Sequence, residues 1–136
     1  TIACFFVALP IVFAIAGAVL ALALIVAGVA AKILHDKGIS ADVINIHTIK
    51  PLDQEAIIKS VNKTGCVVTA EEHNFFGGLG ESVARVLASN NPSPQEFVAV
   101  NDTFGESGTP AKLMEKYGLN ADSIVVNVER VLKRKN

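Results

Sequence analysis

Charge is missing from the first part of this sequence. All 25 acidic and basic residues fall between residues 32 and 136, and residues 1–31 contain none. The chain as a whole has a net charge of -1, with 18% charged residues. A protein that binds nucleic acid or anionic lipid electrostatically carries a clear excess of lysine and arginine. The composition therefore argues against both classes, and we expect no nucleic-acid partner and no membrane partner.

Cysteine and tryptophan are also scarce. The chain has two cysteines, Cys4 and Cys66, and no tryptophan. The cysteines lie far apart, with no second thiol or histidine at metal-ligand spacing. This pattern is typical of buried free thiols and argues against a disulfide framework or a zinc site. It predicts a reducing compartment, the cytoplasm, and no metal site in this chain.

Residues 1–30 form an anomalous apolar segment. All 21 residues from 11 to 31 are apolar or glycine, which meets the length rule for a membrane-spanning helix. Pro10 at the head of the run and the lack of a basic amino-terminal flank argue against a membrane span or a signal peptide. A buried parallel strand also reads as a continuous apolar stretch, and we prefer a strand for residues 22–28. A third interpretation, compatible with strands, is an incompletely determined sequence in which alanine replaces longer polar side chains.

Beyond residue 31 the sequence alternates between helical and strand patterns. The expected helices cover residues 31–36, 51–64, 79–89, 110–117 and 121–135, and the expected strands cover residues 41–46, 66–70 and 97–100. Strands that alternate with helices at this spacing predict an α/β fold with three layers, in which helices cover both faces of a mostly parallel sheet. The 136 residues suit one domain, so we interpret residues 1–136 as a single α/β domain.

A polar stretch follows the strand predicted at residues 66–70. Glu71, Glu72, His73 and Asn74 come where this strand ends, and ligand sites in open α/β sheets lie at that edge. These side chains suit acid–base chemistry, but neighbouring strand residues point to opposite faces and cannot all line one pocket. We take His73 as the candidate catalytic residue, and Glu72 and Asn74 as candidates for substrate binding or an interface. The alternative is a polar strand end that is hydrogen-bonded to neighbouring loops.

A glycine-rich turn comes next. Gly77, Gly78 and Gly80 open a predicted helix, where unsatisfied backbone N–H groups hold anions in other proteins. The turn lacks the lysine of a phosphate-binding loop and the spacing of a dinucleotide-binding motif. A tight turn that lets the helix pack closely on the sheet is the simpler interpretation. A nucleotide- or anion-binding module is the alternative.

Several separated motifs resemble one family. They are residues 38–53, Glu71-Glu72-His73-Asn74 with Gly77-Gly78-Leu79-Gly80, Phe104-Gly105-Glu106-Ser107-Gly108, and Tyr117-Gly118-Leu119. In order and spacing they resemble the carboxy-terminal domain of transketolase over residues 31–136, as part of one chain or as the C-terminal subunit of a split enzyme. The family has a longer helix before residue 31. If the first strand lies at residues 22–28, about two turns of that helix are missing.

The resemblance implies an enzyme that transfers ketol groups between sugar phosphates, as in the pentose phosphate pathway. Such enzymes use thiamine diphosphate and a divalent cation, Mg²⁺ or Ca²⁺, bound between two other domains of a homodimer. The Gly-Asp-Gly signature of the diphosphate-binding domain is absent from this sequence. The resemblance thus implies that this chain binds no cofactor and helps to assemble the dimer and shape the active site. Its partners are the other transketolase domains or an N-terminal subunit. Deoxyxylulose-phosphate synthases and oxo-acid dehydrogenase E1 β subunits share the domain and are alternatives.

Overall fold

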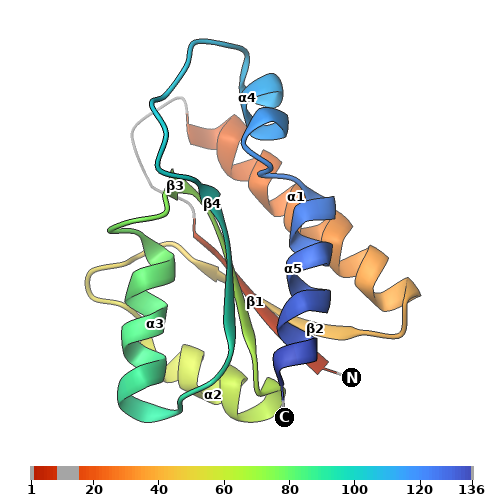
Figure 1. Cartoon of the computed structure of the whole chain (residues 1–136), viewed down its shortest axis with the longest axis vertical. Coiled ribbons are helices and arrows are strands. Elements are labelled where there is room, and N and C mark those ends of the chain that lie inside the picture. The colour runs from red at the N-terminus through yellow and green to blue at the C-terminus, as the bar shows by residue number, and fades with distance from the viewer. Residues whose placement is uncertain (1, 9–15, 136) are drawn as a thin grey trace.

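A computed structural model describes residues 2–8 and 16–135, with side chains described from Ile25 onward. Strands and helices alternate along most of the described chain (Figure 1). The described elements are β1 (Ile2–Ala8), α1 (Ala16–Asp36), β2 (Ser40–Ile46), α2 (Gln54–Thr64), β3 (Val67–Asn74), α3 (Leu79–Asn90), β4 (Gln95–Val100), α4 (Pro110–Lys116) and α5 (Ala121–Arg134). The α/β class predicted from the sequence is confirmed.

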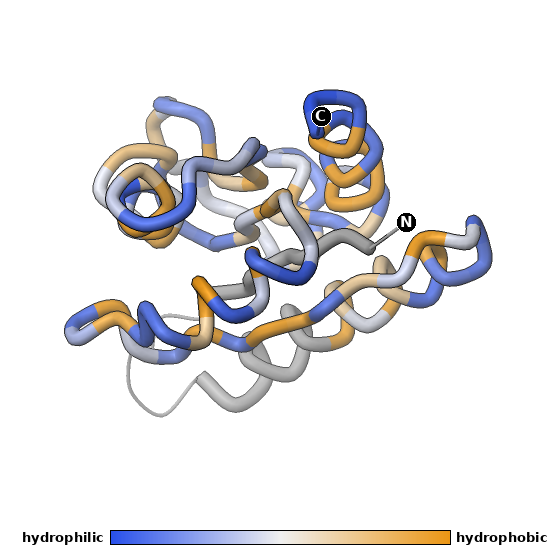
Figure 2. The backbone as a smooth tube through the Cα atoms, turned by 90° about the horizontal axis from the view of Figure 1, so that it is seen from below, coloured by the Kyte–Doolittle hydropathy of each residue, from blue (hydrophilic) through white to orange (hydrophobic). Residues whose placement is uncertain are grey.

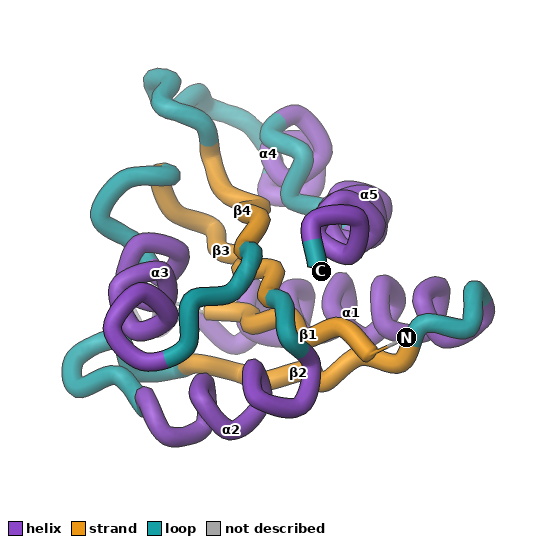
Figure 3. The backbone as a smooth tube through the Cα atoms, turned by 60° about the horizontal axis from the view of Figure 1, so that its bottom comes forward, coloured by secondary structure: helices purple, strands orange, loops and turns teal. Residues whose placement is uncertain are grey.

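The described strands form one sheet in the order β2-β1-β3-β4, and every neighbouring pair is parallel. Figures 1 and 3 show α1 and α5 on one side of these strands and α2 and α3 on the other. Because the strands are parallel, their carboxyl ends meet at one edge of the sheet. The loops that follow β2, β3 and β4 therefore gather at this carboxyl edge.

The apolar segment differs from the strand predicted at residues 22–28. That prediction is wrong, because these residues lie inside α1, which runs unbroken from Ala16 to Asp36, and the first strand is β1. Alanine and leucine are the commonest residues of α1, and both favour a helix over a strand. Helix α1 supplies the helical turns that a strand at residues 22–28 would have left missing before residue 31. Pro10 lies outside the described residues.

The carboxyl half of α1 buries one stripe of side chains. Ala27, Ala30 and Leu34 are buried at helical spacing, whereas Ile25 and Val29 are 59% and 46% exposed. The buried stripe joins the cluster of apolar residues formed with α5. In the part of the chain that the structure describes, no helix is both long and apolar enough to cross a membrane.

Strand β3 separates two apolar clusters. Val68 and Ala70 belong to the cluster with α1 and α5, and Val67 belongs to the cluster with α2 and α3. This division follows from the alternation of side chains along a strand. Figure 2 shows hydrophobic and hydrophilic segments alternating along the helices, as expected where one side of each helix packs on the sheet.

Helix α2 begins at Gln54, later than the start predicted at Pro51. Asp53 is the N-cap, and its Oδ1 accepts a hydrogen bond from the Ala56 N–H at 3.0 Å. An aspartate in this position satisfies a backbone donor that the helix itself cannot satisfy, so the cap decides where α2 starts. The predicted end at residue 64 is confirmed, and Gly65 closes α2 in the left-handed conformation with φ of 72°.

We expect Leu34→Ala to lower the free energy of unfolding by about 2–5 kcal/mol, because it leaves a cavity between α1 and the core. The Leu34 side chain is 0% exposed. Urea unfolding followed by circular dichroism measures the change. The control is Val29→Ala on the exposed side of α1, which should alter stability by less than about 0.5 kcal/mol. Equal losses for the two variants would contradict the orientation of α1.

We also expect Asp42 to make stability depend on pH. Its carboxylate accepts hydrogen bonds from Lys63 Nζ at 2.7 Å and Ser60 Oγ at 3.0 Å. The bond from Lys63 holds the pKa of Asp42 below its usual value. A pKa lowered by folding stabilises the protein above the unfolded pKa of about 3.9, and this contribution disappears as the pH falls through the folded pKa.

The stability difference between the unmodified chain and Asp42→Asn should therefore be largest near pH 7 and shrink below about pH 4. Thermal melts across this range measure it. A difference that stays constant with pH would show that the carboxylate charge does not matter.

Candidate functional site at the carboxyl edge

The polar residues predicted to follow a strand lie within it. β3 extends to Asn74, and its pairing with β4 shifts register between Ala70 and Asn74. The Glu71 side chain is buried at 6% exposure, whereas Glu72 and His73 are exposed. The four polar residues therefore do not share one pocket, because Glu71 is buried and the neighbouring Glu72 and His73 side chains are exposed.

Glu71 binds the amino terminus of α3. Its Oε2 accepts the Leu79 N–H at 2.7 Å, and its Oε1 accepts the Gly80 N–H at 2.8 Å. The first N–H groups of a helix lack partners within the helix and carry partial positive charge, so a carboxylate at this position is favourable. Glu71 thus performs internally what a bound anion performs in phosphate-binding turns.

The glycines of the turn allow this contact. A Cβ atom at Gly78 would collide with the Glu71 carboxylate, and one at Gly80 would collide with the Phe97 ring. Gly77 has a φ of 78°, and its N–H donates to Glu81 Oε2 at 2.9 Å. The geometry thus fits a close-packed turn. It disfavours the anion-binding interpretation, because carboxylates of the protein already occupy these donors.

His73, the predicted catalytic residue, lies on the surface. Its Nδ1 is 2.9 Å from the backbone oxygen of Asn74. Glu72 is also exposed, and neither side chain lies in an enclosed pocket. Both face outward at the carboxyl edge, where another protein can reach them, so the catalytic role of His73 stays a prediction.

Asn74 connects two loops at this edge. Its Oδ1 accepts the Phe76 N–H at 2.9 Å, and its Nδ2 donates to Asp102 Oδ1 at 3.4 Å. The first bond orders the turn after β3, and the second reaches the loop after β4. Asn74 is therefore a structural link between the two loops.

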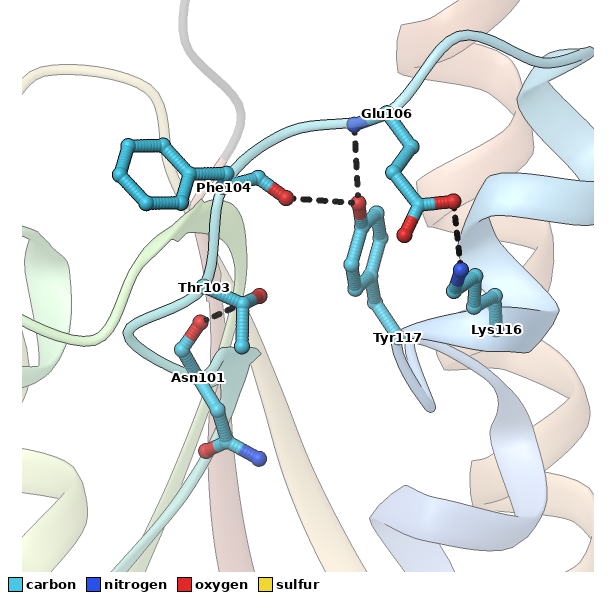
Figure 4. Close-up of a pocket in the computed structure, with 6 residues that line it drawn as sticks. All are labelled: Asn101, Thr103, Phe104, Glu106, Lys116 and Tyr117. Atoms are coloured by element: carbon cyan, nitrogen blue, oxygen red, sulfur yellow. Dashed lines mark hydrogen bonds and ion pairs between the residues drawn. The ribbon is translucent and has the colours of Figure 1, made fainter.

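A pocket of about 260 Å³ lies in the loop after β4. Its lining residues are Asn101, Thr103, Phe104, Glu106, Lys116 and Tyr117 (Figure 4). The Tyr117 hydroxyl accepts the Glu106 N–H at 3.1 Å and lies 3.5 Å from the Phe104 carbonyl oxygen, to which it donates. Phe104, Glu106 and Tyr117 belong to the motifs described above. The sequence does not indicate that they form a pocket, because Tyr117 lies 11 residues after Glu106 in the chain.

An ion pair closes one side of this pocket. Lys116 Nζ lies 2.6 Å from Glu106 Oε2, and this hydrogen bond raises the pKa of Lys116 above its usual value. The lysine is therefore engaged by a carboxylate of the same pocket and is a poor site for a second anion.

Comparison with known proteins identifies the family. The sequence pattern described as the transketolase C-terminal domain matches residues 20–124. The chain belongs to the transketolase C-terminal domain family. The match begins inside α1 and includes both the glycine-rich turn and the loop after β4.

Relatives of this transketolase-family chain include subunits of transketolases. It is 49% identical over 107 residues to the 6-deoxy-6-sulfo-D-fructose transketolase subunit SqwH of Clostridium sp. (strain MSTE9), covering 79% of this chain and 33% of that protein. It is 37% identical over 105 residues to an apulose-4-phosphate transketolase subunit of Phocaeicola vulgatus, covering 77% of this chain and 33% of that protein. The chain therefore spans about a third of the length of these relatives.

The chain is also similar to a synthase and to a solved transketolase structure. The chain is 37% identical over 106 residues to the 1-deoxy-D-xylulose-5-phosphate synthase of Symbiobacterium thermophilum, covering 77% of this chain and 16% of that protein. Among solved structures, it resembles a split gene transketolase, described as an inactive beta4 tetramer, with a TM-score of 0.81 and 44% identity. That match covers 98% of this chain and 40% of the other.

The glycine-rich turn of this transketolase-family domain does not fit the diphosphate of the family's cofactor. A diphosphate bound with a divalent cation needs free N–H donors and a set of oxygen ligands. The N–H groups of Gly77, Leu79 and Gly80 already bind carboxylates. Over the described residues, His, Cys, Asp and Glu form no group of three or more that suits a metal ion.

We expect Glu71→Gln to lower the free energy of unfolding by about 1.5–3 kcal/mol, because a charged acceptor of two N–H bonds becomes an amide with only one oxygen. Chemical unfolding measures the loss. Glu72→Gln on the exposed side of β3 is the matched control, and its effect should stay within about 0.5 kcal/mol. A Glu71→Gln variant as stable as this control would contradict the capping role.

Proposed function

We propose that this chain is the C-terminal part of a thiamine-diphosphate-dependent transketolase that moves ketol groups between sugar phosphates. The observation that carries the proposal is the family match over residues 20–124, together with the identity of 49% to a transketolase subunit. In this proposal the chain helps to assemble the enzyme and to shape its active site. The cofactor and its cation, Mg²⁺ or Ca²⁺, are held by other parts of the enzyme.

The occupied helix terminus supports this division of labour. Glu71 takes the N–H groups at the start of α3 that a diphosphate would otherwise use. In open α/β sheets, ligands lie outside the carboxyl ends of the strands. A domain whose carboxyl edge holds no ligand of its own can still help to form an active site, if another part of the enzyme packs against that edge. We therefore propose that Glu72, His73 and Asn74 lie at an interface with another domain or with an N-terminal subunit, in a homodimer of the complete enzyme. We also propose that residues 1–136 form the single three-layer α/β domain predicted from the sequence.

The substrate class follows from the relatives. The names of two relatives specify 6-deoxy-6-sulfo-D-fructose and apulose 4-phosphate, both sugars with a strongly acidic group. We therefore propose ketoses with a terminal phosphate or sulfonate as donors. Deoxyxylulose-phosphate synthase chemistry is the second candidate, and the 37% identity to such a synthase favours it less than the 49% identity to the transketolase subunit.

The complete protein, with any subunit that co-purifies, should form a new ketose from a ketose phosphate or sulfonate and an aldehyde acceptor. The reaction should require thiamine diphosphate and Mg²⁺, and mass spectrometry of the sugars detects the product. Residues 1–136 alone should give no heat on titration with thiamine diphosphate, since their helix terminus is occupied.

Formation of deoxyxylulose phosphate and CO2 from pyruvate and glyceraldehyde phosphate would instead support the second candidate. Cofactor binding by residues 1–136 alone would contradict the proposed division of labour.

A further inference from the structure

The loop between β4 and α4 presents an apolar side chain to solvent. Residues 101–110 are all exposed, and the Phe104 side chain is 96% exposed. In the loop after β3, Phe76 is 57% exposed. Both loops follow neighbouring parallel strands and lie at the carboxyl edge (Figure 1). Large apolar groups gathered on one surface are typical of protein interfaces.

Hydrogen bonds hold the Phe104 loop in one shape. Tyr117 binds the backbone on both sides of Gly105, through the Phe104 carbonyl and the Glu106 N–H. The ion pair between Lys116 and Glu106 ties the loop to α4 a second time. Figure 4 shows the Phe104 ring pointing away from Tyr117. A loop backbone held in this way loses less conformational entropy when a partner covers it.

Contacts between aromatic rings support Phe76 from inside the domain. The Phe75 and Phe97 ring centroids lie 5.0 Å apart, and those of Phe75 and Phe76 lie 5.3 Å apart with an interplanar angle of 88°. Phe97 lies on β4, so these contacts run from the sheet to the surface. Edge-to-face aromatic pairs of this kind are favourable, so Phe76 has a defined position.

Asn74 connects the two loops that carry the exposed phenylalanines. Its side chain binds the Phe76 N–H and the Asp102 carboxylate, and Asp102 lies two residues before Phe104 in the chain. The two exposed phenylalanines therefore sit on backbone segments that the same amide connects.

We propose that Phe76 and Phe104 form a docking surface for the cofactor-binding part of the transketolase, which rests on the function proposed above. The related transketolase subunits are about three times as long as the aligned part of this chain, since that part covers 33% of their length. The remaining length is a large body of protein that a C-terminal domain must contact. The carboxyl edge is the place for that contact, because sites of α/β sheets form there.

The apolar and charged side chains of this docking surface indicate which side chains its partner presents. Phe104 enters an apolar recess of the cofactor-binding part, and the pocket of about 260 Å³ beside it receives a side chain in return. The exposed Asp102 carboxylate is hydrogen-bonded to Asn74, so the recess is flanked by a basic side chain.

Site-directed photo-crosslinking in the complete, assembled enzyme tests the partner. Phe104→p-benzoylphenylalanine places a reactive group in the docking surface, and mass spectrometry identifies the crosslinked peptide. We expect a peptide from the cofactor-binding part. The same substitution at Val126, which is 53% exposed on α5, is the control and should not yield that peptide. A crosslink only to a second copy of this domain, or none at Phe104, would overturn the proposal.

A second variant tests the energetic contribution. Phe104→Ser should weaken the contact with the cofactor-binding part about tenfold or more, as expected for a central aromatic residue of an interface. Amide hydrogen exchange of residues 101–109, measured in the complete enzyme, should become faster by the same factor, and Val126→Ser should leave it unchanged. If exchange in this loop is equally fast in the two serine variants, Phe104 is not a docking residue. The unmodified enzyme's ketol transfer is measured separately, so failure of the docking surface is distinguishable from failure of the proposed function.

Discussion

The contact between the Glu71 carboxylate and the amino terminus of α3 constrains the rest of the carboxyl edge. Two N–H bonds of 2.7 and 2.8 Å fix the start of α3 to the carboxyl half of β3. The contact leaves no room for a Cβ atom at Gly78, which explains the glycine there. It also uses the donors that give many α/β domains their phosphate site. A fold that looks like a ligand-binding domain therefore has its usual anion position filled from within.

Because the Glu71 carboxylate occupies that position, the polar residues available for contact with other molecules are the exposed ones at the carboxyl edge. β3 continues past Glu71, and its last residues organise loops instead of enclosing a substrate. Asn74 joins the turn after β3 to the loop after β4, and Tyr117 holds that loop from the end of α4. The result is a surface of fixed shape with two outward phenylalanines. The aligned part of the chain covers 33% of the length of two related transketolase subunits.

The apolar first third illustrates where pattern recognition is weak. A run of residues 11–31 without polar positions has no periodicity, so it does not distinguish a buried strand from a helix. The structure resolves the choice in favour of α1 for residues 16–36, and the first strand lies earlier, at β1. From residue 32 onward polar residues mark the period and the caps. There the predicted elements agree with the structure apart from their ends, such as the start of α2 at Gln54.

The sequence by itself determined the α/β class, the order of elements after residue 31 and the family, because caps, glycine turns and hydrophobic periods are local and are written in consecutive residues. Only the tertiary structure decided what the polar residues do. Glu71 reaches N–H groups eight and nine residues further along the chain, and Tyr117 reaches a loop more than ten residues before it. Satisfaction of a buried donor or acceptor depends on distance in space, and that distance exists only once the strands and helices have packed.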